Sequence, residues 1–300
     1  MERIGIDLGG SKIEIAVLDA RGGEALRRRI ATPAGDYAAT LEAIARLVAD
    51  AERERGARCS VGVAMPGALS LATGLVKNAN STCLNGRPLK ADLESLLGRE
   101  VRLANDANCF ALSEAWDGAA RGAAVVFGVI LGTGVGGAIV VDGRVLTGAN
   151  AIAGEWGHNP LPMPGADDRP LPRCYCGREG CVETFLSGPG LCADHARATG
   201  ERIDAAEIAR RAAAGDAACE ATLGRYEARL ARSLAGVVNI VDPDVIVLGG
   251  GLSNLSRLYG NVPALWGRHV FSDAVCTRLV PPMHGDSGGV RGAARLWGRP

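Results

Sequence analysis

The sequence has no excess charge of either sign and no apolar run of membrane length. Its 33 Lys and Arg residues balance 33 Asp and Glu residues, so no overall field attracts nucleic acid or an acidic membrane surface. A membrane-spanning helix needs about 20 consecutive apolar residues, and the first expected strand begins at Arg3, which leaves no room for a signal peptide. We therefore expect a cytoplasmic protein that binds neither nucleic acid nor membranes.

Two common nucleotide-binding motifs are also missing. The P-loop pattern G-x-x-x-x-G-K-[ST] does not occur. Gly132–Gly137 does match the dinucleotide pattern G-x-G-x-x-G, but that pattern requires a helix directly after the glycines. The next residues, Ala138–Val141, are mostly β-branched and lead into Asp142-Gly143, a strong hairpin signal. A Rossmann site and a P-loop are therefore both excluded.

Three of the nine cysteines lie within eight residues, at Cys174, Cys176 and Cys181. Three thiolates on one tight loop need one further ligand to make the tetrahedral site that zinc prefers. Among only four histidines, His158 has the best surroundings to complete a structural Cys₃His site. A redox pair or plain buried thiols are the alternatives, and the other six cysteines are expected to be reduced core residues.

The order of the expected elements indicates a duplicated α/β fold. A strand–glycine turn–strand pattern at Arg3–Leu8 and Ile13–Leu18 returns at Val125–Leu131 and Ala138–Val141. With 300 residues, 47% of them apolar, the chain is long enough for two domains. We expect a small N-terminal domain over residues 1–117, joined by a C-terminal helix at 290–300, and a large domain over residues 118–289.

Both strand pairs enclose a glycine-rich turn, Asp7–Lys12 in the first half and Gly132–Gly137 in the second. Glycines allow backbone N–H groups to approach phosphate oxygens closely. Together with Gly249–Gly251, the two turns favour a phosphate-binding cleft between the halves. Asp7 is suited to orient a hydrated Mg²⁺ on a nucleotide. The alternative is that these glycines only form tight turns.

Asp106 is the candidate catalytic base. It lies in Asn105–Asn108, between an expected strand and an expected helix, where Asp is also a good helix N-cap. In isolation the cap is the simpler interpretation, but a carboxylate here also suits an alcohol that attacks phosphorus and must lose its proton. Asn105 and the two acids beside the predicted zinc ligands, Glu155 and Glu183, suit a polyhydroxylated substrate.

Six segments, in this order, resemble the motifs of the ROK family of sugar kinases and sugar-responsive repressors. They are Ile4–Lys12, Asn105–Asn108, Gly132–Gly137, Gly154–His158, Cys174–Glu183 and Asp242–Gly251. The resemblance covers essentially the whole chain and implies an actin-like (ribonuclease H-like) α/β fold of two domains, with ATP and a sugar meeting in the cleft. The expected cofactors are Mg²⁺ with the ATP and a structural Zn²⁺, and a homodimer is expected.

The resemblance implies a role for each candidate residue, with Asp106 as the catalytic base. The expected substrate-binding residues are Gly67, Asn80, Asn105, Asp106, Glu155, His158 and Glu183. The expected ATP-binding residues are Asp7, Gly9, Gly10, Ser11, Lys12, Gly132, Thr133, Gly134, Gly136, Gly249, Gly250 and Gly251. The expected metal ligands are His158, Cys174, Cys176 and Cys181. Ser11 stands where the family usually has Thr, and it keeps the hydroxyl.

Within the family, four segments look closest to bacterial fructokinases (manno/fructokinases). They are Val76–Thr82, Leu84–Gly86, His158–Pro162 and His284–Ser287. N-acetylglucosamine kinases are nearly as similar across Asp106–Trp116 and Val129–Gly137.

The resemblance implies ATP-dependent phosphorylation of a free hexose. Fructose giving fructose 6-phosphate is the preferred interpretation, with mannose as a further substrate. N-acetylglucosamine kinase or glucokinase activity is the alternative within this class of enzyme, and a non-catalytic sugar sensor is the alternative from another class. A repressor is disfavoured, because the expected strand at Arg3 leaves no room for a DNA-reading domain ahead of it.

Overall fold

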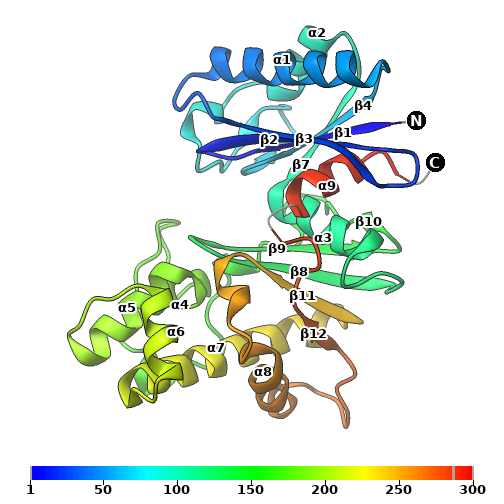
Figure 1. Cartoon of the computed structure of the whole chain (residues 1–300). Helices are drawn as coiled ribbons and strands as arrows, with labels where there is room; N and C mark the ends of the chain where they lie inside the picture. The colour runs from blue at the N-terminus through cyan, green and yellow to red at the C-terminus, as the bar shows by residue number, and fades with distance from the viewer. Residues whose placement is uncertain (1, 286–287, 299–300) are drawn as a thin grey trace. The chain divides into compact units, whose positions relative to one another are not determined.

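The computed structural model describes residues 2–285 and 288–298, which fall into two compact units (Figure 1). The first unit contains the described residues of Met1–Gly118, Gly143–Ala153 and Asp286–Pro300, and the second contains Ala119–Asp142 and Gly154–Gly285. The domain boundaries expected from the sequence stay a prediction.

The first unit is built on a five-stranded sheet with the strand order β3-β2-β1-β4-β7. Its strands are β1 (Arg3–Leu8), β2 (Lys12–Leu18), β3 (Glu24–Ala31), β4 (Ser60–Met65) and β7 (Val101–Asn105). Strand β1 pairs antiparallel with β2 and parallel with β4. Nearly every residue of β1, β2 and β4 is buried, as expected for central strands covered on both faces.

Helices cover both faces of this sheet (Figure 1). They are α1 (Tyr37–Arg55), α2 (Leu89–Leu97), α3 (Asp106–Asp117) and α9 (Gly288–Arg295), and short elements are β5 (Ala68–Leu69), β6 (Val76–Lys77), η1 (Thr82–Leu84) and β10 (Arg144–Val145). Helix α1 begins at the N-cap Asp36, whose side chain accepts a hydrogen bond from the Ala39 N–H, and ends at Gly56 with a left-handed φ of 64°. Asp is a favourable N-cap residue, and Gly readily adopts the left-handed conformation that ends a helix.

Helix α9 lies directly against the backbone of its neighbours. A Cβ at Gly5 in β1 would lie 1.9 Å from the Val290 carbonyl oxygen, and one at Gly62 in β4 would lie 1.9 Å from that of Ala293. On the helix itself, a Cβ at Gly292 would lie 1.7 Å from the Cys109 carbonyl oxygen in α3. Only glycine fits at these three positions, so this approach fastens α9 to β1, β4 and α3.

The second unit repeats the opening of the first. Its strands β8 (Val125–Leu131), β9 (Val135–Val141), β11 (Val245–Gly249) and β12 (Arg278–Val280) lie in the order β9-β8-β11-β12. Strand β8 pairs antiparallel with β9 and parallel with β11, which reproduces the pairing of β1 with β2 and β4. The internal duplication expected from the sequence is therefore present in the strand topology.

The remaining elements of the second unit are mainly helical. The α-helices are α4 (Glu183–Leu186), α5 (Gly188–Thr199), α6 (Ala205–Ala213), α7 (Ala217–Val241) and α8 (Leu258–Trp266), and the 3₁₀ turns are η2 (Trp156–His158), η3 (Ala166–Asp168), η4 (Gly251–Asn254) and η5 (Gly267–His269). Helix α7 carries Leu223, Leu230 and Leu234 into a core shared with β8 and β11. Among the described residues, none of the helices combines the length and apolarity that crossing a membrane requires.

Candidate active site and metal centre

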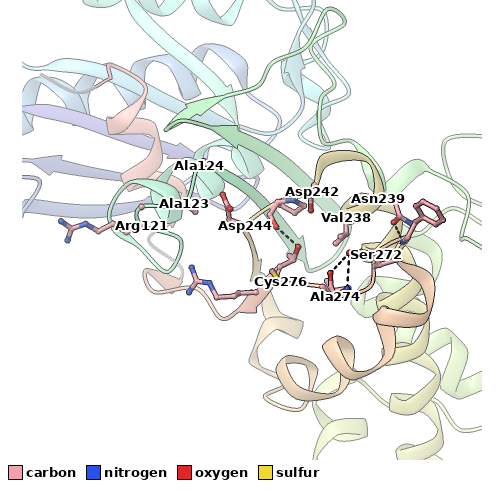
Figure 2. A pocket seen from close by; sticks show the side chains of 17 residues that line it. Arg121, Ala123, Ala124, Val238, Asn239, Asp242, Asp244, Ser272, Ala274 and Cys276 are labelled. Carbon is pink, nitrogen blue, oxygen red and sulfur yellow. Dashed lines mark hydrogen bonds between the residues drawn. The ribbon is translucent and has the colours of Figure 1, made fainter.

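One hollow among the described residues of the second unit lies away from the candidate site. It has a volume of about 980 Å³, and its lining includes residues at or just before the first residues of β8, β11 and β12, among them Arg121, Asp244 and Arg278 (Figure 2). These residues lie at the amino ends of parallel strands, whereas α/β proteins bind ligands at the carboxyl ends. The glycines after β8 and β11 lie at the other end of the strands.

Asp106 lies at the carboxyl end of β7, at the first residue of α3. The N-cap of α3 is Asn105 and not Asp106, which corrects the simpler interpretation of the sequence: the Asn105 Oδ1 accepts the Ala107 N–H at 2.9 Å. The Asn105 Nδ2 donates to the Gly67 carbonyl oxygen at 3.0 Å. Asn105 thus joins α3 to the turn after β4, and the neighbouring residue Asp106 keeps access to solvent although protein surrounds its carboxylate.

The electrostatic surroundings of Asp106 and Asp7 favour proton binding. Desolvation by the surrounding protein raises the pKa of Asp106, against the lowering effect of hydrogen bonds from Ala107 and Asn105. Desolvation, followed by the negative charges of Asp106 and Glu14, raises the pKa of Asp7 to about 6. Two carboxylates that repel each other in one unit are typical of acid–base or cation-binding sites.

Two hydrogen bonds fix the shape of the turn after Asp7. The Gly9 N–H donates to the Lys12 carbonyl oxygen at 2.9 Å, and the Gly9 carbonyl oxygen accepts from the Thr32 hydroxyl at 2.7 Å. Gly10 and Ser11 are exposed at the tip of the turn. A Cβ at Gly10 would lie 3.3 Å from the Ser81 hydroxyl oxygen, so the exposed tip of the turn borders the loop after β6.

Gly67 and Asn80 lie close to Asn105 in the first unit. Gly67 has a φ of 72°, and a Cβ there would meet the Lys77 carbonyl oxygen at 2.4 Å and the Ala79 N at 2.6 Å. The neighbouring Asn80 side chain is exposed. The structure therefore brings Gly67, Asn80, Asn105 and Asp106 into one region of this unit, around the ends of β4 and β7.

In the second unit the Gly132–Gly137 turn packs tightly against the segments expected to bind substrate. The Val135 N–H donates to the Glu183 carboxylate at 2.9 Å. A Cβ at Gly157 would lie 2.1 Å from the Val135 carbonyl oxygen, and the Trp156 indole N–H donates to the Gly136 carbonyl oxygen at 2.9 Å. Thr133 is exposed at the tip. This turn is thus anchored by α4 and η2, with only its tip free to meet a ligand.

The third glycine cluster follows β11 and lies beside the same turn. Gly250 has a φ of 80°, and a Cβ there would lie 2.4 Å from the Leu131 carbonyl oxygen. The Gly250 carbonyl oxygen accepts from the Ser253 hydroxyl at 2.7 Å. The structure therefore brings Gly249–Gly251 next to Gly132, as a phosphate site made from both turns requires.

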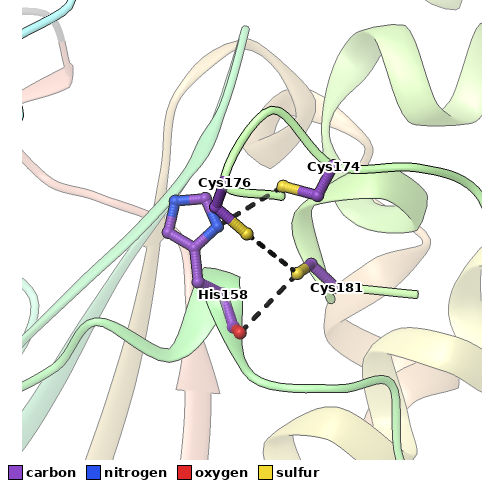
Figure 3. A group of neighbouring side chains, drawn as sticks. All are labelled: His158, Cys174, Cys176 and Cys181. Carbon is purple, nitrogen blue, oxygen red and sulfur yellow. Dashed lines mark hydrogen bonds between the residues drawn. The ribbon is translucent and has the colours of Figure 1, made fainter. Parts of the chain in front are cut away.

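The three clustered cysteines and His158 come together in the second unit (Figure 3). Their four ligand atoms all lie within 4.8 Å of one another. The Cys174 Sγ lies 3.6 Å from the His158 Nδ1, and the Cys176 Sγ lies 3.6 Å from the Cys181 Sγ. The cysteine loop is closed by a backbone hydrogen bond from the Gly177 N–H to the Cys174 carbonyl oxygen at 3.0 Å.

These distances fit a tetrahedral zinc ion. With Zn–S and Zn–N bonds of about 2.3 and 2.1 Å, ligand atoms in a regular tetrahedron are separated by roughly 3.6–3.8 Å. Hydrogen bonds from Arg178 lower the pKa of Cys176 to about 6, whereas burial raises the pKa of Cys181 to about 12. The three sulfur atoms and the imidazole Nδ1 make up a Cys₃His donor set, and a bound zinc ion would hold the sulfurs as thiolates.

Tyr175 is a site residue that the sequence reasoning missed. Its hydroxyl lies 2.9 Å from the His158 Nε2, and its ring contacts the imidazole edge-on at a centroid distance of 5.2 Å. Partial desolvation, followed by the nearby negative charges of Glu183 and Glu155, raises the pKa of this largely exposed phenol. Both acids therefore lie near the Tyr175 hydroxyl. The sequence did contain a signal for Tyr175, because it is an aromatic residue between two predicted metal ligands, Cys174 and Cys176, in a polar loop.

The family assignment agrees with this geometry. The family model described as the ROK family matches residues 3–299. The chain belongs to the ROK family. An N-acetyl-D-glucosamine kinase of Salmonella paratyphi B is 42% identical over 296 residues, covering 97% of this chain and 98% of the relative.

Solved structures of ROK proteins share the fold. A ROK hexokinase from Thermus thermophilus has a TM-score of 0.87 at 34% identity, covering 99% of this chain and 97% of that one. A ROK glucokinase from Streptomyces griseus, in complex with glucose and AMPPNP, has a TM-score of 0.77 at 26% identity, covering 99% of both chains. The two-domain α/β fold of the ROK sugar kinases expected from the sequence is confirmed.

The expected closeness to fructokinases is not confirmed, because the relative of 42% identity is an N-acetyl-D-glucosamine kinase. Of the segments that suggested fructokinase, Val76–Lys77 forms β6. Within His284–Ser287, Asp286 and Ser287 lie outside the described residues.

Proposed function

We propose that this ROK protein is an ATP-dependent sugar kinase that phosphorylates N-acetylglucosamine. The observation that carries the proposal is the 42% identity to an N-acetyl-D-glucosamine kinase across nearly the full length of both chains. A ROK glucokinase that binds glucose and AMPPNP shares the fold and supports ATP as the phosphoryl donor. N-acetylglucosamine, the alternative substrate expected from the sequence, is therefore preferred here to fructose.

The proposed base is Asp106, at the end of β7. Its pKa is raised by desolvation, which makes the carboxylate a better proton acceptor than an aspartate of ordinary pKa. Because the transition state of phosphoryl transfer is loose, the base mainly orients the sugar hydroxyl and accepts its proton late. Asn105, fixed by its hydrogen bonds to Ala107 and Gly67, holds the start of α3 and so the position of this carboxylate.

Sugar contacts are proposed for residues of both units: Gly67, Asn80 and Asn105 in the first, and Glu155, His158 and Glu183 in the second. The zinc ligands proposed are His158, Cys174, Cys176 and Cys181. The metal would supply rigidity, because it would join η2 to the cysteine loop that precedes Glu183.

Phosphate contacts are proposed for the glycine-rich turns. The exposed backbone of Gly10 and Ser11 in the first unit, and of Thr133, Gly250 and Gly251 in the second, offers N–H groups to phosphate oxygens. The remaining proposed ATP-binding residues of these turns are Gly9, Lys12, Gly132, Gly134, Gly136 and Gly249. Asp7 would hold a hydrated Mg²⁺ ion, which neutralises charge on the transferred phosphate. Mg²⁺ and ATP are therefore the proposed cofactor and donor, and a cytoplasmic homodimer is the proposed form of the enzyme.

The test is a coupled assay of ATP consumption with fructose, mannose, glucose, N-acetylglucosamine and N-acetylmannosamine. We expect the highest kcat/KM with N-acetylglucosamine, and NMR of the product then identifies the phosphorylated hydroxyl. A preference for fructose would restore the first interpretation of the sequence. Sugar binding without turnover of any of the five would instead indicate a sensor.

A further inference from the structure

One arginine in α7 of the second unit is almost completely buried. Arg229 is 2% exposed. Its Nε donates to the Asp168 Oδ1 at 2.7 Å, and its NH2 group lies 3.0 Å from the Asp194 Oδ1. Asp168 and Asp194 are themselves 3% and 5% exposed. Burying three charges is unfavourable unless each is well paired, so this cluster depends on accurate placement of all its members.

The first segment that Arg229 holds precedes the cysteine loop. Asp168 closes the turn η3, where its Oδ2 accepts the Gly165 N–H at 2.7 Å. The Arg229 NH2 group also donates to the Asp167 carbonyl oxygen at 3.1 Å. This turn lies between His158 and Cys174 in the sequence, so fastening it to α7 restrains the chain that joins the two ligands.

The second segment follows the cysteine loop. The Arg229 guanidinium lies 5.1 Å from the ring centroid of Phe185, a distance typical of a cation–π contact. Phe185 belongs to α4, which begins at Glu183. One turn earlier in α7, the Tyr226 hydroxyl donates to the Leu186 carbonyl oxygen at 2.9 Å. Helix α7 therefore holds α4 at two points, both within three residues of Glu183.

We propose that Arg229 is a positioning residue for sugar binding, because it clamps the segments on both sides of the cysteine loop and thereby fixes Glu183 and the metal ligands relative to each other. The inference rests on the proposed function for its sugar readout. Arg229 itself touches neither proposed ligand set. It acts through Asp168 on the ligand-bearing loop and through Phe185 on the short helix that carries Glu183.

The same helix supplies a matched control. Glu227, 4% exposed, pairs with Arg257 and accepts from the Asn261 side chain at 3.0 Å. This cluster fastens α8 to α7, and in the part of the chain that the structure describes no hydrogen bond or ion pair joins it to the cysteine loop. Asp168→Asn and Glu227→Gln each neutralise one buried carboxylate that is paired with arginine. Only Asp168 lies in the segment that leads into the cysteine loop.

The experiment compares Arg229→Lys, Asp168→Asn and Glu227→Gln with the unaltered protein. The readouts are KM for sugar, KM for ATP, kcat, the midpoint of thermal unfolding and the rate at which a chromogenic chelator removes zinc. For Arg229→Lys and Asp168→Asn we expect about tenfold faster zinc release and about tenfold higher sugar KM, with the ATP KM within about twofold. For Glu227→Gln we expect lower thermal stability with zinc release and sugar KM unchanged.

Two outcomes would overturn the inference. One is an equal rise in sugar KM and zinc release in all three variants that follows their loss of stability. The other is no change in either quantity in Asp168→Asn, which decides the question if Arg229→Lys does not fold. If the unaltered protein phosphorylates none of the sugars, the proposed function fails, and zinc release alone still decides whether Arg229 positions the loop.

Discussion

The two glycine-rich turns start from the same local structure and end in different surroundings. Both join the antiparallel strands of a hairpin whose first strand also pairs with a parallel neighbour. In the first unit the turn begins at Asp7, whose pKa is raised by burial and by the charge of Asp106. In the second, the turn donates a backbone hydrogen bond to Glu183 and packs on Trp156.

This difference indicates that the two copies of the motif have different roles. The first unit keeps carboxylates in unfavourable surroundings, which is a common property of groups that exchange protons or bind cations. The second unit pairs the Glu183 carboxylate with a backbone N–H and gathers His158 with three cysteines, which is typical of a scaffold that holds ligands in place. Substitutions in the first unit should therefore alter chemistry, and those around the metal loop of the second should alter binding.

The largest expected effect tests the chemical role of the first unit. Asp106→Asn removes the proton acceptor and keeps the shape of the side chain. We expect kcat to fall by about 10³-fold while sugar and ATP affinities stay nearly unchanged. Steady-state kinetics with calorimetric binding of both ligands checks this. Near-normal turnover would remove Asp106 from the mechanism.

A second test addresses the scaffold role of the second unit. Cys176→Ser, or treatment with a strong chelator, should release zinc and loosen the loop before Glu183. We expect about a tenfold rise in sugar KM and a lower unfolding temperature, with kcat at saturating sugar reduced much less. Metal analysis of freshly purified, reduced protein supplies the control. Protein without zinc but with a normal sugar KM would contradict the scaffold role.

Much of the fold and of the candidate site was predictable from the sequence, because these features depend on short stretches of chain. The hairpins, the caps of α1 and the Cys₃His cluster each depend on residues close together in the chain or on rare residue types. Contacts between residues that are far apart in the sequence were not predictable. Arg229 meets Asp168 across 61 positions, and the Val135 N–H meets Glu183 across 48. No pattern in the sequence specifies which buried charges will meet, because this depends on how the helices pack.

A third test concerns the packing that closes the first unit. Gly62→Ala would place a methyl group 1.9 Å from the Ala293 carbonyl oxygen, so α9 must move away from β4. We expect a loss of about 2–4 kcal/mol in the free energy of unfolding. Gly224→Ala is the control, because Gly224 lies in α7 with no atom within 4 Å of the added Cβ. That change should stabilise by about 0.5–1 kcal/mol, and similar losses in both variants would exclude the close contact as the cause.

The smallest effect is a pH dependence of stability caused by Asp7. Its pKa rises from 3.8 to about 6 in the folded chain, so between these pH values the folded state binds more protons than the unfolded state. Stability therefore falls as the pH rises through this window, and the loss persists above it. Asp7→Asn removes this term, and we expect the variant to gain about 2 kcal/mol relative to the unaltered protein between pH 4 and pH 7.

Denaturant unfolding of both proteins at half-unit pH steps measures that difference directly. Asp7→Asn should also lower activity, because the proposed Mg²⁺ contact is lost, so a more stable and less active variant is the expected combination. A constant difference in stability across the pH range would mean that Asp7 titrates normally. The contrast between the two turns would then rest on Asp106 alone.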